Sequence, residues 1–111
     1  MWLLDANMDV HLTGVLAEFG IGAETAVARG WKAISNGELV AAAAAGGFEC
    51  LLTRDRLFGE STSHALRAHA KFAVVLITLP QQRWPEYRQQ FLQAWAVSPI
   101  KPKPGCFIEW P

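Results

Sequence analysis

The sequence predicts an α/β protein in which a central, mostly parallel sheet of four or five strands is covered by helices on both faces. Short, almost purely apolar runs alternate along the chain with segments of helical periodicity, a pattern typical of parallel strands buried on both sides. The chain has 111 residues, of which 51% are hydrophobic and 18% charged, enough apolar surface for one core. Because no repeat or linker divides it, we expect residues 1–111 to form a single domain.

The strands are predicted from apolar runs that are too short to be helices. They are WLLD at 2–5, TAVA at 25–28, ECLLT at 49–53 and FAVVLIT at 72–78, with CFIEW at 106–110 as a fifth. The proline-containing tract 98–105 is expected to be a stiff, exposed connection before the last strand.

Helical periodicity predicts connecting helices over 8–19, 36–45, 60–70 and 85–96. The first is expected to end at Gly20 and the alanine-rich second at Gly46, because glycine commonly follows a helix C-terminus. Ser35 and Glu38 have the spacing of a capping box at the start of the second helix. Pro85 stands in the first turn of the fourth, where proline is well tolerated.

Charge and hydropathy narrow the class of protein. Ten basic residues balance ten acidic ones, so the overall charge gives no argument for nucleic-acid binding, although a local basic patch can exist. Cys50 and Cys106 lie in apolar runs without metal-ligand spacing, which predicts small buried side chains in a reducing compartment. The first residues lack the features of a secretory signal, and the longest apolar run, 72–80, is too short to cross a bilayer. We therefore expect a cytoplasmic protein with no membrane partner.

Tryptophan is unusually frequent near the C-terminus, with Trp84, Trp95 and Trp110 among five in the chain. Large aromatic side chains either fill a small core or anchor a partner surface, including that of a homodimer. The sequence does not separate these two roles.

Three acids are candidates for a common site. Asp5 stands at the carboxyl end of the first predicted strand, and Asp55 follows the third. Functional residues of parallel sheets collect at the carboxyl ends of the strands, so these two carboxylates can converge. Glu38, near the start of the alanine-rich helix, is the third. Carboxylates gathered in this way can hold Mg²⁺ and position a water against a phosphodiester.

Each acid also has a purely structural interpretation. Asp5 or Asn7 can cap the first helix, and the capping box favours a structural role for Glu38 taken alone. Asp55 can be an ion-paired loop residue between Arg54 and its neighbour at 56. No Gly-rich phosphate loop or nucleophile arrangement is present in the sequence.

Basic residues are expected to flank the acids and to meet phosphate groups, with an ordinary solvated surface as the alternative. They are Arg54, Arg56, Arg67 and Lys71.

Three blocks of the sequence resemble, in order and spacing, a small PIN-like domain (PilT N-terminus type), the compact branch that is similar to VapC-type toxin ribonucleases. The blocks are LLDANM at the first strand, SNGELVAAAAAGGF in the middle and LLTRDRLFG after the third strand. The resemblance covers nearly the whole chain, and LLTRD after an alanine-rich helix is its most specific part. It implies a three-layer α/β/α fold and an acid cluster that binds Mg²⁺ or Mn²⁺ and cleaves RNA with a metal-activated water. Since VapC-type toxins are usually paired with an antitoxin, it also implies a small protein partner.

Residue by residue, the resemblance implies that Asp5, Glu38 and Asp55 are catalytic metal ligands. It further implies that Asn7 and Thr53 support these acids. Arg54 and Arg56 are expected to bind the phosphate.

The chain also departs from the family pattern. Ala6 stands where relatives often have glutamate, and Leu57 stands where they often have a further acid, so the cluster is one acid short unless Asp9 or Glu60 replaces it. We therefore carry two hypotheses, a PIN-like ribonuclease and an inactive PIN-like module that acts through protein contacts. A flavodoxin-like nucleotide-binding domain is disfavoured because no phosphate loop is present.

Overall fold

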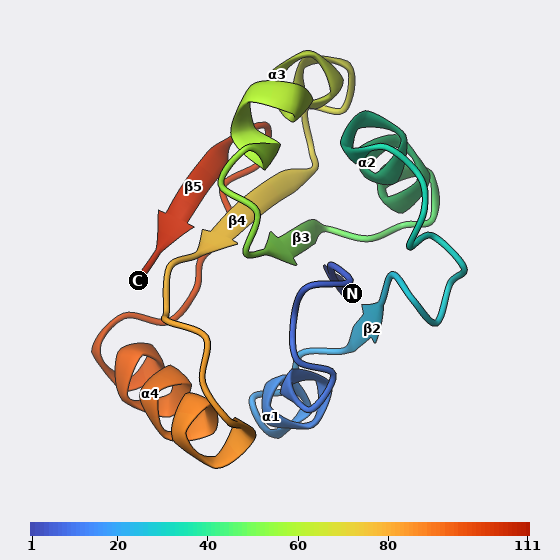
Figure 1. Cartoon of the computed structure of the whole chain (residues 1–111). Coiled ribbons are helices and arrows are strands. Elements are labelled where there is room, and N and C mark those ends of the chain that lie inside the picture. The colour runs from blue at the N-terminus through green and yellow to red at the C-terminus, as the bar shows by residue number, and fades with distance from the viewer.

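The computed structural model describes the backbone of residues 1–111 and all side chains except those of residues 59–61. Strands and helices alternate strictly along the described chain, as predicted (Figure 1). In order they are β1 (Trp2–Leu4), α1 (Leu12–Glu18), β2 (Ala23–Thr25), α2 (Asn36–Ala45), β3 (Cys50–Thr53), α3 (Phe58–Ala68), β4 (Ala73–Ile77), α4 (Trp84–Val97) and β5 (Phe107–Trp110).

The strands form one five-stranded sheet in the order β2-β1-β3-β4-β5, and every neighbouring pair is parallel. The predicted sheet is therefore confirmed. The chain first steps from β1 outward to β2 and then returns past β1 to β3, so the direction of winding reverses between β1 and β3. Ligands of open α/β sheets bind outside the carboxyl ends of the strands at such a switch point.

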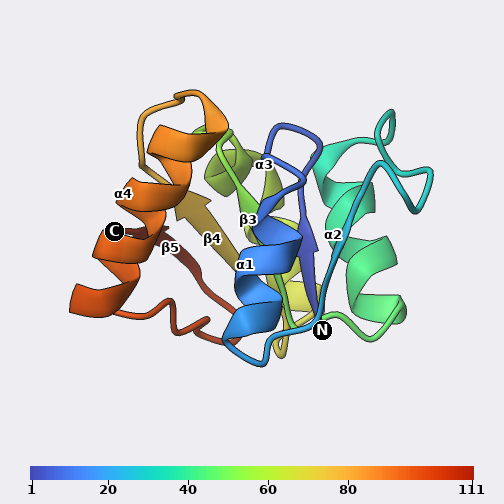
Figure 2. The same ribbon diagram turned by 90° about the horizontal axis from the view of Figure 1, so that it is seen from below.

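Helices cover both faces of the sheet, which gives the three layers that the sequence predicted. Leu4, Leu52 and Val75 point into a core shared with α1 and α4. Leu3 and Leu51 point to the opposite face, into a core shared with α2 and α3. In Figure 1 the first pair of helices lies below the sheet and the second pair above it, and Figure 2 shows α1 and α4 side by side in front of the strands.

Two elements differ from their predicted bounds, because hydrogen bonds from backbone N–H groups to side chains stabilise turns there. β2 covers Ala23–Thr25 and not 25–28, since the Thr25 hydroxyl accepts a hydrogen bond from the Ala28 N–H at 3.1 Å. α1 begins at Leu12 and not at residue 8, since the Asp9 carboxylate accepts the His11 N–H at 2.9 Å. The other helices match their predicted spans to within two residues at each end.

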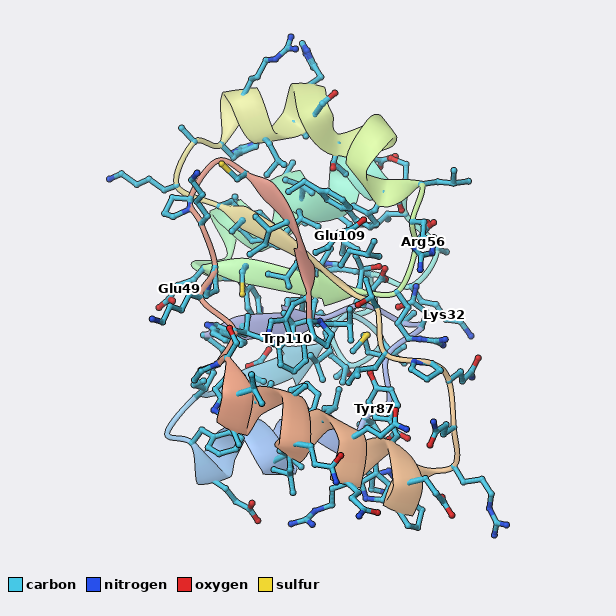
Figure 3. The ribbon with its side chains drawn as sticks, turned by 90° about the vertical axis from the view of Figure 1, so that its left-hand side faces the viewer. Lys32, Glu49, Arg56, Tyr87, Glu109 and Trp110 are labelled. Carbon is cyan, nitrogen blue, oxygen red and sulfur yellow. The ribbon has the colours of Figure 1, made fainter. Side chains whose placement is uncertain are left out.

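The three tryptophans near the C-terminus all contribute to the core, Trp110 fully and the other two in part. Trp110 is 5% exposed, and its Nε1–H donates to the Ser98 carbonyl at 2.7 Å. Trp84 and Trp95, both on α4, are half-buried and pack against the core that α1 and α4 share with the sheet. Figure 3 shows Trp110 between the sheet and α4.

One connection differs in hand from the others. The steps β3-α3-β4 and β4-α4-β5 move in the same direction across the sheet, yet α3 and α4 lie on opposite faces. The β4-α4-β5 crossover therefore has the opposite hand to β3-α3-β4, and the first two crossovers share the hand of β3-α3-β4. Since parallel crossovers are nearly always right-handed, at least one connection departs from that rule.

None of the helices in the described part of the chain has an apolar stretch long enough to span a bilayer. Both cysteines are free thiols: Cys50 is fully buried, as predicted, whereas Cys106 is only half-buried.

Candidate active site at the carboxyl end of the sheet

Thr53 links the two acids that the sequence placed at neighbouring strand ends. The Asp5 N–H donates to the Leu52 carbonyl at 2.9 Å, which extends the pairing of β1 with β3 and sets Asp5 opposite Thr53. The Thr53 hydroxyl donates to Asp5 Oδ2 at 2.7 Å and accepts the Asp55 N–H at 3.1 Å. Thr53 itself is fully buried. A single hydroxyl thus orients the loops that carry both carboxylates.

Asn7 ties the same two loops together from the other side. Its Oδ1 accepts the Arg54 N–H at 3.2 Å, and its Nδ2 approaches the Thr53 hydroxyl at 3.5 Å. Neither Asn7 nor Asp5 caps α1, because the residue at the cap position is His11 and it makes no side-chain cap. The supporting role predicted for Asn7 and Thr53 is consistent with these contacts.

Asp55 is held by the backbone that follows it and by the neighbouring helix. Its Oδ1 accepts the Leu57 N–H at 2.9 Å, and Asn36 Nδ2 approaches its Oδ2 at 3.5 Å. Asp55 makes no salt bridge with Arg54 or Arg56, so it is not the ion-paired loop residue of the structural interpretation.

Glu38 occupies the capping position that its spacing predicted. Ser35 is the N-cap of α2 and accepts the Glu38 N–H at 3.3 Å, while the Ser35 hydroxyl donates to the Glu38 carboxylate at 2.8 Å. The carboxylate therefore bonds to the serine side chain and not to the serine N–H. The residue of α2 that contacts Asp55 is Asn36, which the sequence analysis did not single out as a site residue.

The basic residues divide between the two ends of the sheet. Arg54 and Arg56 follow β3 at the carboxyl end, and Figure 3 shows Arg56 on the same edge of the molecule as Lys32 and opposite Glu49. Arg67 lies in the last turn of α3 and Lys71 precedes β4, so both stand at the amino end. The expectation that these last two flank the acids is wrong, because α3 carries the chain back across the sheet before them.

Asp5 and Asp55 are of the donor type that Mg²⁺ prefers. No three His, Cys, Asp or Glu side chains gather as a ligand group among the described residues. Mg²⁺, however, is usually bound by one or two carboxylates with several retained waters, and Asp5 and Asp55 supply two. Of the proposed substitutes for the missing acid, Asp9 bonds to the His11 ring at 2.7 Å, and the side chain of Glu60 lies outside the described residues.

A cavity of about 180 Å³ lies at the same end of the sheet, beside Asn7 and Arg54, and neither Asp5 nor Asp55 lines it. It is lined by Asn7, Met8, Asp9, Arg54, Gln81, Gln82 and Tyr87. Figure 3 shows Tyr87 on the side of α4 that faces the sheet. Tyr87 was not predicted as a site residue, because it lies on a predicted amphipathic helix, where an aromatic residue indicates core packing. No local sequence pattern connects it to residues 7–9 or 54.

Burial raises the pKa of Tyr87 to about 12, with the charge of Asp9 acting in the same direction and that of Arg54 against it. Tyr87 therefore presents a protonated hydroxyl at neutral pH.

Comparison with known protein families, characterised proteins and solved structures finds no match to this chain.

Proposed function

We propose that this chain is a metal-dependent ribonuclease of the PIN-like class, with Asp5 and Asp55 as the carboxylate ligands of one Mg²⁺ or Mn²⁺. The observation that carries the proposal is the Thr53 hydroxyl, which bonds to Asp5 and to the Asp55 backbone at the point where the sheet reverses its winding. This buried hydroxyl holds the Asp5 carboxylate directly and the Asp55 loop through its backbone, so both loops are positioned before any ion binds.

The residues of the chain divide the work of phosphodiester hydrolysis. Asp5 and Asp55 would hold the ion, and Thr53 and Asn7 keep their loops in register. The bound ion would supply an activated water and stabilise the charge that develops on the phosphate. Arg56 is exposed on the same edge and forms no salt bridge with the carboxylates of the described residues. It can therefore attract the phosphates of the nucleic-acid strand. As a toxin-like nuclease, the chain would bind a small antitoxin.

Titration calorimetry with Mg²⁺ and Mn²⁺ tests the metal site. The parent protein is compared with Asp5→Asn and Asp55→Asn, and with Asp9→Asn as a matched control that removes a nearby carboxylate outside the pair. We expect binding to be lost in the first two variants and kept in the control. Absence of binding by the parent, or equal binding by all variants, would contradict the proposal.

Cleavage of single-stranded RNA then separates the nuclease from its alternative. A specific observation favours an inactive PIN-like module: Leu57, at the position of the fourth acid, is 68% exposed and adds no ligand. Metal-dependent cleavage that disappears in Asp5→Asn would support the ribonuclease. Metal binding without cleavage of any RNA or DNA would favour the inactive module.

A further inference from the structure

The cavity beside Asn7 and Arg54 is built from segments far apart in the sequence. Its wall comes from the loop after β1, the residue that follows β3, the loop before α4 and the first turn of α4. We call it the Arg54–Tyr87 pocket, after the two side chains whose polar atoms are left unsatisfied inside the protein. Its polar lining is completed by Asn7, Asp9, Gln81 and Gln82.

Two polar atoms at this pocket are buried without a hydrogen-bond partner. They are Nε of Arg54 and the hydroxyl of Tyr87, a residue only 4% exposed. Buried donors in native proteins are almost always paired, so two of them at one cavity call for an acceptor inside it. Both groups donate: the guanidinium has no acceptor capacity, and the tyrosine is protonated at neutral pH.

The unpaired donors of the pocket, and not its net charge, favour an anionic acceptor, since the lining holds one cation, Arg54, and one anion, Asp9. Arg54 forms no salt bridge with any carboxylate in the described part of the chain. Asp9 is the one acid of the lining, and its Oδ1 already accepts two hydrogen bonds from His11, from the backbone N–H at 2.9 Å and the ring Nδ1 at 2.7 Å. Arginine and a neutral hydroxyl together form the usual donor set for a phosphate oxygen.

The pocket shares two residues with the loops of the candidate active site. Arg54 stands between Thr53 and Asp55, and its backbone N–H donates to Asn7, so Arg54 and Asn7 border both sites. The same two residues therefore place the pocket next to the loops that carry the acid pair.

We propose that the Arg54–Tyr87 pocket binds a second phosphate of the nucleic-acid strand, next to the one positioned for cleavage. This inference rests on the proposed function, and it adds a substrate class: strands with adjacent phosphates, in preference to isolated phosphodiesters. Arg54 supplies the charge and Tyr87 a directed hydroxyl.

Binding is measured in EDTA, so that the result does not depend on the metal site. Inorganic phosphate, adenosine monophosphate and a short single-stranded RNA are titrated into the parent, Tyr87→Phe and Arg54→Gln. The charge-matched control is Arg67→Gln, an exposed arginine in the last turn of α3 at the opposite end of the sheet. We expect each pocket variant to lose about ten-fold in affinity for phosphate and for RNA, the usual effect of one charge-assisted hydrogen bond. The control should lose less than about three-fold for phosphate, as exposed charges do.

Tyr87→Phe removes only an unpaired hydroxyl, so it should fold as well as the parent, and its melting curve verifies this. The proposal is overturned if the folded variant binds phosphate as the parent does, or if the parent binds no phosphate. RNA must also bind more tightly than the mononucleotide, since equal affinities would assign the pocket to free phosphate compounds and not to a strand. If phosphate binding depends on Tyr87 while Mg²⁺ does not bind at all, the phosphate pocket is supported and the proposed ribonuclease is contradicted. If Mg²⁺ binds while phosphate binding does not depend on Tyr87, only the pocket is contradicted.

Discussion

At the scale of single residues, one buried hydroxyl organises the candidate site. The pattern of β3 is apolar throughout, and valine at position 53 would satisfy it as well as threonine. The Thr53 hydroxyl instead makes three contacts. It donates to Asp5, and it accepts from Asp55 and, at longer range, from Asn7. A hydroxyl offers one donor and two acceptor positions, so Thr53 uses its full capacity.

Thr53→Val should therefore destabilise the protein without changing its packing. The Asp55 N–H loses its acceptor and the Asp5 carboxylate loses a donor, which we expect to cost about 1–2 kcal/mol of unfolding free energy. Urea denaturation measures this cost, with Thr53→Ser as the variant that keeps the hydroxyl. Similar stabilities for valine and serine variants would mean that the hydroxyl contacts do not hold the loops.

The raised pKa of Tyr87 predicts a loss of folding stability at alkaline pH. Burial raises its folded pKa to about 12, against roughly 10 in an unfolded chain. Below pH 10 the group is protonated in both states; between the two values only the unfolded chain releases the proton, so stability falls as pH rises through that window. Melting temperatures of the parent and Tyr87→Phe, followed from about pH 9 to 11.5, should diverge, with the parent losing more. Parallel curves would contradict the raised pKa.

At the scale of elements, local signals account for what the sequence predicted well. The α2 helix has its predicted span, because its cap at Ser35, its alanine run and its glycine stop all lie within a few residues of one another. Gly47 has φ +84°, a conformation that glycine adopts without strain. β2 and the start of α1 were misplaced because the turns that bound them depend on single hydrogen bonds from Thr25 and Asp9 that periodicity does not register.

The same division applies to the site. Asp5, Thr53 and Asp55 were predictable because each lies at or beside the end of a strand, where a parallel sheet brings residues together regardless of details. The Arg54–Tyr87 pocket was not predictable, because it depends on which face of the sheet α4 covers. The amphipathic pattern of α4 is compatible with either face.

Two substitutions at the start of α2 distinguish a capping role from a ligand role. Ser35→Ala removes the cap and should cost about 1 kcal/mol, which lowers the melting temperature by roughly 4 °C. Glu38→Gln keeps a side chain that can complete a capping box but removes the charge. Because Glu38 is exposed and bonded to Ser35, we expect its variant to retain Mg²⁺ affinity. A ten-fold loss measured by calorimetry would instead make Glu38 a ligand.

At the scale of the whole molecule, the position of α4 connects the unusual crossover to the pocket. If α4 lay on the face of α3, Tyr87 would be on the far side of the sheet from Asp9 and the pocket would not exist. The aromatic residues explain what holds α4 where it is: the ring centroid of Trp110 lies 5.0 Å from that of Phe91 and 6.2 Å from that of Trp95, both on α4. Trp95 in turn stacks on Phe19, directly after α1, at 4.6 Å.

Trp110 should therefore support both stability and phosphate binding. Trp110→Ala removes a large buried side chain and its bond to Ser98, and we expect it to cost about 3–5 kcal/mol. Trp110→Phe keeps the aromatic packing and should cost about 1 kcal/mol for the lost hydrogen bond. Urea denaturation measures both costs, and phosphate titration in EDTA is carried out on whichever variants stay folded.

The matched control is Trp31→Ala, which removes a half-buried tryptophan from the core shared with α2 and α3. Because the described residues of that core include none from α4, the control should lower stability and leave the phosphate affinity of the folded protein unchanged. Trp110→Ala, studied where it is still mostly folded, should weaken phosphate binding as α4 loosens. Equal phosphate affinity in the two variants would mean that phosphate binding does not depend on the packing of α4. A cost below about 1 kcal/mol for Trp110→Ala, far under that of other buried tryptophans, would show that another contact fixes this helix to its face of the sheet.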